Sequence, residues 1–369
     1  MRIIPSATPI SSSDRAFNYG DGVFTTLLVS EHQVELLPYH ISRLEHDAAA
    51  IKLNIDIRAL EAAIAEQVKT IKSGSGDNAS PKYVLKVHVS GGQAGRGYAR
   101  SEDSEALVRF SQHPYPVHYY SLANEGATVI CAQTRLAIQP LLAGVKHMNR
   151  LEQVLVKHEV DDAGAHDAIV CDTRDNIIEA SAGNVFFYLN EQWYTPSLKG
   201  SGVNGVVRQC LIDSLLNDNC SLHVGEYDLS YLRKASAVVI TNALMGVMPV
   251  QKIQMPDFSY VDFDLPEILC LAAYYLMKSY PDKKVLLYGE DEYSSDKSKE
   301  YDLTPARKRR INKNLNSLGF DYKIKSIEKL PTPNWVDPVF SINLIENTTG
   351  KTFNLSDLGY GISQVLPIL

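Results

Sequence analysis

Several features that mark other protein classes are missing from this sequence. No apolar run approaches the ~18 residues of a membrane-spanning helix, and residues 1–14 lack the basic-then-apolar pattern of a signal peptide. The net charge of -7 argues against bulk binding to nucleic acid. The five cysteines are scattered and never form C-x-x-C, so we expect reduced thiols in a cytoplasmic protein. The ten histidines show no convincing ligand spacing, so we expect them to be structural or surface residues and predict no metal site.

The remaining composition is that of an ordinary globular protein. The chain has 369 residues, 45% of them hydrophobic and 21% charged, which suits two or three domains. Strand patterns occur at 22–29, 33–37, 83–89, 107–110, 127–131, 168–171, 184–189 and 237–241. Helical spacing occurs at 38–52, 57–72, 149–164 and after Gly205. Because these segments follow no regular βαβ rhythm, we predict an α+β fold and not a doubly wound sheet.

Proline and changes in polarity suggest the domain boundaries. Residues 113–121 (HPYPVHYYS) contain two prolines and no helical pattern, which predicts an interdomain linker. After about residue 256 the composition changes, and 281–314 turn polar. We therefore expect a small α/β domain at 1–113, a linker at 114–122, a larger domain at 123–258, a closing helix or junction at 259–284, and a separate segment at 285–369.

Two charged residues, Lys146 and Glu179, could bind and activate a cofactor that carries an aldehyde group. Lys146 follows an apolar stretch in LLAGVKHMNRLEQ, and an apolar pocket with a nearby cation lowers the pKa of a lysine so that it can attack an aldehyde. Glu179, in DNIIEASAGNVFF, could pair with a pyridinium nitrogen. Each residue alone would more often be a surface side chain.

Three further segments could bind anions. GSGVNG (200–205) opens a predicted helix whose first N–H groups could hold a phosphate. The segment also matches the dinucleotide motif of a nicotinamide oxidoreductase, but no βαβ unit surrounds it. Arg43 could bind a phosphate bidentately, unless it pairs with Asp47 on the helix surface. Arg96, in GGQAGRGY, could bind a carboxylate, unless it is a mobile loop residue.

Taken together and in this order, the motifs resemble the fold-type IV pyridoxal-phosphate enzymes, and within them the aminodeoxychorismate lyases. The matching segments are DRAFNYGDGVFTT (14–26), HISRL (40–44), SGGQAGRGY (90–98), GVKHMNRLEQVL (144–155), EASAGNVFF (179–187), GVNGVVRQ (202–209) and TNALMGVMPV (241–250). The resemblance covers about residues 1–255 and implies a small N-terminal domain followed by a larger pseudo-barrel. Branched-chain and D-amino-acid aminotransferases share this layout and remain the alternative.

The resemblance implies a role for each matching residue. Lys146 is expected to be the Schiff-base and proton-transfer lysine, and Glu179 to hold the pyridine nitrogen of pyridoxal phosphate. The expected phosphate ligands are Arg43, the amides of Val206 and Val207, Thr241 and Asn242, with Asn184 beside the ring. Arg96, Thr25 and Thr26 are expected on the substrate side. The implied reaction converts 4-amino-4-deoxychorismate to 4-aminobenzoate and pyruvate in folate biosynthesis, in a cytoplasmic homodimer without membrane or nucleic-acid partners.

The C-terminal segment resembles a different family. FNLSDLGYGISQVLPIL (353–369) is similar to the signature region of ABC-type predicted ATPases. We expect an incomplete fragment, because Ile345 stands where a P-loop around TGKT (349–352) would require glycine. The alternative from another functional class is a nucleotide-dependent interaction protein that uses this segment, and the missing P-loop counts against it. A gene fusion, a frameshift and an assembly artefact would each explain such a segment.

Overall fold

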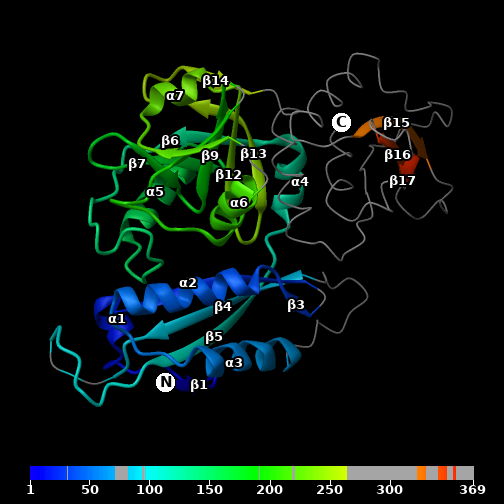
Figure 1. Ribbon diagram of the computed structural model, residues 1–369. Coiled ribbons are helices and arrows are strands. Elements are labelled where there is room, and N and C mark those ends of the chain that lie inside the picture. The colour runs from blue at the N-terminus through cyan, green and yellow to red at the C-terminus, as the bar shows by residue number, and fades with distance from the viewer. Residues whose placement is uncertain are drawn as a thin grey trace. The chain divides into compact units, whose positions relative to one another are not determined.

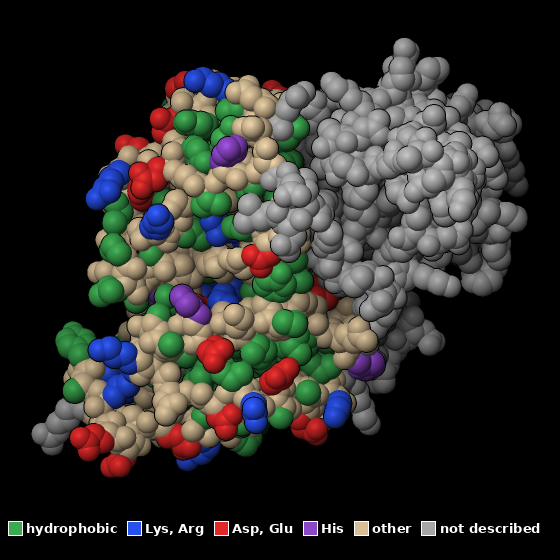
Figure 2. Space-filling model, viewed as in Figure 1, with side chains coloured by type: hydrophobic (Ala, Val, Ile, Leu, Met, Phe, Trp, Pro, Cys, Tyr) green, Lys and Arg blue, Asp and Glu red, His purple; other side chains and the backbone are tan. Residues whose placement is uncertain are grey.

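The computed structural model describes residues 1–30, 32–70, 82–93, 95, 97–190, 192–217 and 221–263, and three strands farther along the chain (Figure 1). The chain divides into two compact units, of which the first comprises 1–213 and 221–263 and the second 214–220 and 264–369. None of the described helices is long and apolar enough to cross a membrane. On the face in Figure 2, acidic and basic side chains are interspersed over the first unit.

The first unit begins with a five-stranded sheet in the order β1–β5–β4–β2–β3. Its strands are β1 (Arg2–Ile4), β2 (Gly22–Ser30), β3 (Gln33–Val34), β4 (Lys82–Ser90) and β5 (Leu107–Pro114). Only β1 and β5 pair in parallel; the other pairs are antiparallel. The strands predicted at 22–29 and 33–37 are found as β2 and β3, which pair with each other, although β3 is only two residues long.

Two long helices pack on this sheet and follow a short one. The three are α1 (Arg15–Tyr19), α2 (Leu37–Ala50) and α3 (Ile57–Thr70). Leu44 of α2 and Leu60 and Ile64 of α3 are fully buried and share one hydrophobic core with β2 and β4. Leu60 and Ile64 are four residues apart, which places them on one face of α3. The helices predicted at 38–52 and 57–72 are confirmed by α2 and α3.

The rest of the first unit is built on a nine-stranded mixed sheet in the order β11–β10–β9–β12–β13–β6–β7–β8, with β14 paired to β13. Its strands are β6 (Ala127–Cys131), β7 (Asp167–Cys171), β8 (Ile177–Ala180), β9 (Asn184–Leu189), β10 (Gln192–Pro196), β11 (Leu222–Gly225), β12 (Ala237–Asn242), β13 (Gly246–Gln254) and β14 (Tyr260–Asp262). The sheet contains both parallel and antiparallel pairs, so the predicted α+β class is confirmed. Since β8 also contacts β9 and β10, the sheet curls on itself.

Four helices accompany this sheet: α4 (His118–Glu125), α5 (Leu151–Asp162), α6 (Val206–Asn217) and α7 (Leu229–Lys234). The predicted helices at 149–164 and after Gly205 are confirmed by α5 and α6. Residues 113–121 were expected to contain no helix. This expectation is wrong, because α4 begins within that segment. Pro114 and Pro116 lie before the helix, where a missing N–H breaks no intrahelical hydrogen bond.

Beyond residue 263 the structure describes an antiparallel three-stranded sheet. Its strands are β15 (Tyr322–Lys329), β16 (Phe340–Glu346) and β17 (Thr352–Asn354). Three predicted features lie outside the described residues. They are most of the ATPase-like signature at 353–369, residues 349–351 of the TGKT segment, and the predicted closing helix beyond residue 263.

Candidate active site

Lys146 lies on the loop between β6 and α5, and its main chain is held from two sides. Its N–H donates to Oδ2 of Asp47 at 3.0 Å, and its carbonyl accepts the N–H of Phe24 at 3.0 Å. Two residues earlier, Gly144 forms a bridge with Val203. The loop is therefore joined both to the five-stranded sheet and to the segment that leads into α6.

The side chain of Lys146 is half-buried among cations. Its Nζ lies 4.7 Å from the centre of the Phe24 ring. Burial lowers the pKa of the Lys146 amine to about 7, and the guanidinium groups of Arg43 and Arg150 act in the same direction. A large share of the amine is therefore uncharged at neutral pH, as a nucleophilic lysine must be.

Glu179 is a buried carboxylate on β8, only 4% exposed. Its Oε2 accepts the N–H of Val203 at 2.8 Å, and its Oε1 lies 3.5 Å from Nε2 of Gln153. Burial raises the pKa of Glu179, whereas the Val203 hydrogen bond and the charges of Arg150 and Lys146 oppose that rise. A carboxylate in such a place can hold the proton of a ring nitrogen.

Arg43, Thr241 and the start of α6 carry hydrogen-bonding groups that could hold an anion. Nε of Arg43 and Oγ1 of Thr241 are both buried and have no hydrogen-bond partner in the described part of the chain. The first N–H groups of a helix, here those of Val206 and Val207, have no acceptor within the helix. Because buried polar groups are almost always paired, these atoms fit an anion such as a phosphate.

Asn184 connects these groups. Its Nδ2 donates to the carbonyl of Val203 at 2.8 Å, and its Oδ1 accepts the N–H of Gly205 at 3.1 Å. In the pairing of β9 with β12 it lies opposite Thr241. A Cβ at Gly205 would come within 2.2 Å of the Asn184 Oδ1, so a larger residue at this turn would displace the Asn184 side chain.

The predicted cofactor residues are thus brought together by a continuous set of contacts. Lys146 interacts electrostatically with both Arg43 and Glu179. Glu179 and Asn184 both hydrogen-bond to Val203, and Asn184 borders the first turn of α6. Among the described residues, no three His, Cys, Asp or Glu side chains gather in the manner of metal ligands.

Comparison with known families decides what kind of chain this is. The family described as amino-transferase class IV matches residues 22–253. The chain belongs to this family. The class IV chain is 34% identical over 263 residues to the aminodeoxychorismate lyase of Vibrio harveyi, a match that covers 71% of the chain and 93% of that enzyme.

Two further matches are a lyase of known structure and an aminotransferase. The crystal structure of 4-amino-4-deoxychorismate lyase from Pseudomonas aeruginosa is 30% identical and has a TM-score of 0.64. This match covers 70% of the chain and 92% of that structure. The D-alanine aminotransferase of Listeria monocytogenes is 25% identical over 246 residues, which cover 66% of the chain and 82% of that enzyme.

Thr25, predicted on the substrate side, has a hydroxyl group that contacts the candidate phosphate ligand Arg43. It is fully buried, and its Oγ1 accepts a hydrogen bond from Nη2 of Arg43 at 2.5 Å and lies 2.6 Å from Nδ1 of His40. Burial lowers the pKa of His40 well below its usual range, so the ring is neutral and its Nδ1 can accept the Thr25 hydroxyl proton. Thr25 therefore orients Arg43. The half-buried Thr26 points to the other face of β2.

Asn242 is used within its own turn. Its Nδ2 donates to the carbonyl of Ala182 at 3.0 Å. Its Oδ1 accepts the N–H groups of Leu244 and Met245 at 2.8 and 2.9 Å. These bonds give the side chain a structural role between β12 and β13, so they do not support its predicted contact with the phosphate.

Arg96 lies outside the described residues, but the loop around it is anchored by Arg15. Nη1 of Arg15 donates to the carbonyl groups of Gly97 and Ala99 at 3.2 and 3.0 Å, and Nη2 donates to that of Tyr98 at 2.8 Å. Arg15 is itself only 4% exposed. The glycine-rich loop is therefore held by a buried guanidinium.

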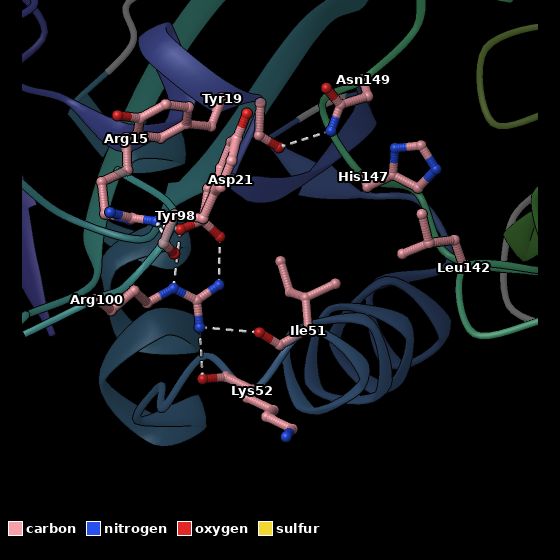
Figure 3. Close-up of a pocket in the computed structure, with 11 residues that line it drawn as sticks. Arg15, Tyr19, Asp21, Ile51, Lys52, Tyr98, Arg100, Leu142, His147 and Asn149 are labelled. Atoms are coloured by element: carbon pink, nitrogen blue, oxygen red, sulfur yellow. Dashed lines mark hydrogen bonds and ion pairs between the residues drawn. The ribbon is translucent and has the colours of Figure 1, made fainter. Parts of the chain in front are cut away.

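Figure 3 shows Asp21 between Arg15 and Arg100 at the edge of a cleft of about 460 Å³. Oδ2 of Asp21 accepts from Nε of Arg15 at 2.7 Å and from Nε of Arg100 at 2.8 Å. Nη1 of Arg100 also donates to the carbonyl groups of Ile51 and Lys52. Both guanidinium groups are thereby occupied. None of the predicted cofactor residues lines this cleft.

Arg150 and Asp47 are residues that sequence reasoning missed. Arg150 donates to the carbonyl groups of His147 and Val145 at 2.8 and 2.7 Å, on either side of Lys146. Asp47 holds the Lys146 N–H and does not form the surface pair with Arg43 that was the alternative reading. Asp47 stands four residues after Arg43 on α2, and on a helix that spacing is typical of exposed ion pairs.

Proposed function

We propose that this chain is an aminodeoxychorismate lyase that binds pyridoxal phosphate and converts 4-amino-4-deoxychorismate to 4-aminobenzoate and pyruvate. One observation carries the proposal: the amine of Lys146, with its lowered pKa, interacts with a buried carboxylate, Glu179, in a site that also holds unsatisfied anion-binding groups. Among the matched relatives, a lyase at 34% identity favours this activity over an aminotransferase at 25%.

The residues of the site suit each part of this cofactor. Arg43, Thr241 and the N–H groups of Val206 and Val207 would hold the phosphate. Glu179 would hold the protonated ring nitrogen. Lys146, with its uncharged amine, would bind the aldehyde carbon covalently.

The reaction then needs a base and a place for electrons. When bound, the protonated pyridine ring withdraws electrons and so acidifies the substrate carbon next to the amine. Nζ of Lys146 removes the proton from that amine-bearing ring carbon. The C–O bond between the ring and the enolpyruvyl group then breaks, which leaves an aromatic ring, and the released group takes up one proton to become pyruvate. The atoms of the substrate equal those of the two products, so no second substrate takes part.

Residues around Lys146 and Glu179 would keep this chemistry in place. Asp47 and Phe24 hold the main chain of Lys146, and Val203 holds the carboxylate of Glu179. We also propose Arg96 as the anchor for a substrate carboxylate, on the basis of its position in the glycine-rich loop.

A D-amino-acid or branched-chain aminotransferase is the second candidate, since an aminotransferase is among the matched relatives. The deciding experiment is incubation of the purified protein with aminodeoxychorismate and no keto acid. We expect 4-aminobenzoate and pyruvate in equal amounts. Absence of both products, together with amino transfer once a keto acid is added, would overturn the lyase proposal in favour of the alternative.

We further propose a cytoplasmic homodimer that acts in folate biosynthesis, with residues 285–369 as an ATPase-like segment that the lyase does not need. Every residue assigned to cofactor or substrate precedes residue 243, which supports this division. A chain cut near residue 280 should keep its visible chromophore. Loss of cofactor binding in that shortened chain would mean that the segment completes the site.

A further inference from the structure

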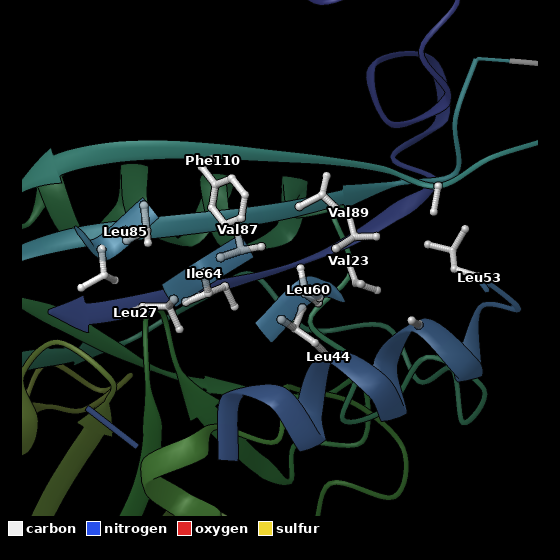
Figure 4. Packing of buried hydrophobic residues seen from close by; sticks show 14 of the residues in the cluster. Val23, Leu27, Leu44, Leu53, Leu60, Ile64, Leu85, Val87, Val89 and Phe110 are labelled. Carbon is white, nitrogen blue, oxygen red and sulfur yellow. The ribbon is translucent and has the colours of Figure 1, made fainter. Parts of the chain in front are cut away.

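Asp47 is a buried carboxylate whose charge the mechanism above does not use. It is 0% exposed and lies on α2, four residues after Arg43. The fully buried Leu44 and Ala48 pack α2 against the five-stranded sheet (Figure 4). Because residues three and four apart share a helical face, this packing turns Asp47 inward together with Arg43.

The carboxylate of Asp47 makes one contact with an exposed side chain and one with the candidate catalytic loop. Oδ1 lies 3.3 Å from Nδ1 of His46, whose side chain is 71% exposed, so solvent screens that contact. Oδ2 accepts the Lys146 N–H at 3.0 Å. A formal negative charge is therefore tied directly to the main chain of the lysine.

The charges around Asp47 come from three segments. Arg43 and His46 lie on its own helix, and Lys146 and Arg150 lie on the loop before α5. Glu179, on β8, acts on the same two loop cations. Burial raises the pKa of Asp47, whereas the Lys146 N–H and the charges of Arg43 and His46 oppose that rise. When ionised, Asp47 therefore offsets part of the positive charge that Arg43 and Arg150 place beside Lys146.

We propose that Asp47 is a positioning residue for Lys146, which fixes the main chain of the lysine and supplies the negative charge that balances the cations around its nitrogen. The inference rests on the proposed covalent role of Lys146. It has a measurable consequence, because a nearby negative charge favours the protonated form of a nitrogen. Without the charge of Asp47, the nitrogen contributed by Lys146 loses its proton at a lower pH.

The test compares variants that separate charge from hydrogen bonding. Asp47→Asn keeps an oxygen that can accept the Lys146 N–H but removes the charge, and Asp47→Ala removes both. Glu45→Gln is the matched control, since it removes one negative charge from an exposed position of the same helix. The readout is the pH titration of the visible band in the full-length protein loaded with pyridoxal phosphate.

We expect Asp47→Asn to lower the midpoint of this titration by about one pH unit, the scale of one charge acting at an effective dielectric constant near 20. The control should stay within about 0.2 unit, as exposed charges do. Asp47→Ala should show the same shift and a further loss of turnover. An unchanged midpoint in a folded Asp47→Asn protein would overturn the proposal.

Two further variants keep the test decisive. If Asp47→Asn fails to fold, Asp47→Glu retains the charge and should keep the wild-type midpoint. A midpoint in Asp47→Glu lowered by about one unit would refute the charge-balancing role. Failure of the proposed function is a separate outcome, because Lys146→Ala would then retain the visible band whatever Asp47 does.

Discussion

The lowered pKa of Lys146 predicts the pH at which the protein takes up its cofactor. With a pKa of about 7, about half of the amine is uncharged at pH 7, whereas an ordinary lysine would be uncharged in roughly 0.04% of molecules. Attachment at neutral pH should therefore be roughly a thousand-fold faster than at an ordinary lysine. The rate should fall about tenfold per unit below about pH 6 and level off above about pH 8.

The assay mixes the cofactor-free protein with pyridoxal phosphate and follows the visible band from about pH 5 to about pH 10. Arg150→Met removes one of the cations that lower the pKa of Lys146, so the midpoint should move to higher pH. Arg174→Met, at an exposed position, is the control and should leave it unchanged. A wild-type rate that still climbs about tenfold per unit between about pH 8 and about pH 10 would refute the reasoning.

Three substitutions test the other groups of the site. Arg43→Ala should weaken cofactor binding by about 2–3 kcal/mol, or roughly 30- to 150-fold, the scale of lost charge-assisted hydrogen bonds; normal affinity with slow turnover would place Arg43 on the substrate instead. Glu179→Gln should keep the cofactor but slow turnover, because a neutral amide cannot hold the ring proton; unchanged turnover with saturating substrate would contradict this role. Thr25→Val should weaken cofactor binding about fivefold, the scale of one hydrogen bond, and Thr25→Ser should restore it; a change in substrate KM alone would return Thr25 to the substrate side.

Periodic segments were the predictable part of the fold. The apolar stripes of α2 and α3 produce one buried face each, and hydrophobic periodicity reports that face directly. The helix after Gly205 was predictable for another reason, since a glycine-rich turn into an apolar helical pattern has few other solutions.

Short elements were not predictable from periodicity. α1 has only five residues, and it depends on a side-chain cap from Asp14 and a left-handed Gly20 at its end. α4 was hidden by the two prolines that precede it. Caps stabilise α1 and contacts with β13 stabilise α4, and a pattern of apolar residues records neither.

The site divides in the same way. Lys146, Glu179 and Arg43 stand in recognisable motifs, so their proximity could be expected from resemblance. The partners that orient them could not, because a buried Asp47 or a His40 bonded to Thr25 depends on which helical face the core turns inward. Charged residues at these spacings usually lie in solvent.

The central claim is that Lys146 carries the cofactor, and borohydride reduction of the loaded protein tests it most directly. Reduction makes the link permanent, and mass spectrometry of the digested protein identifies the modified peptide. The account predicts the added mass of reduced pyridoxal phosphate on Lys146. The same mass on any other lysine, or on none, would contradict it.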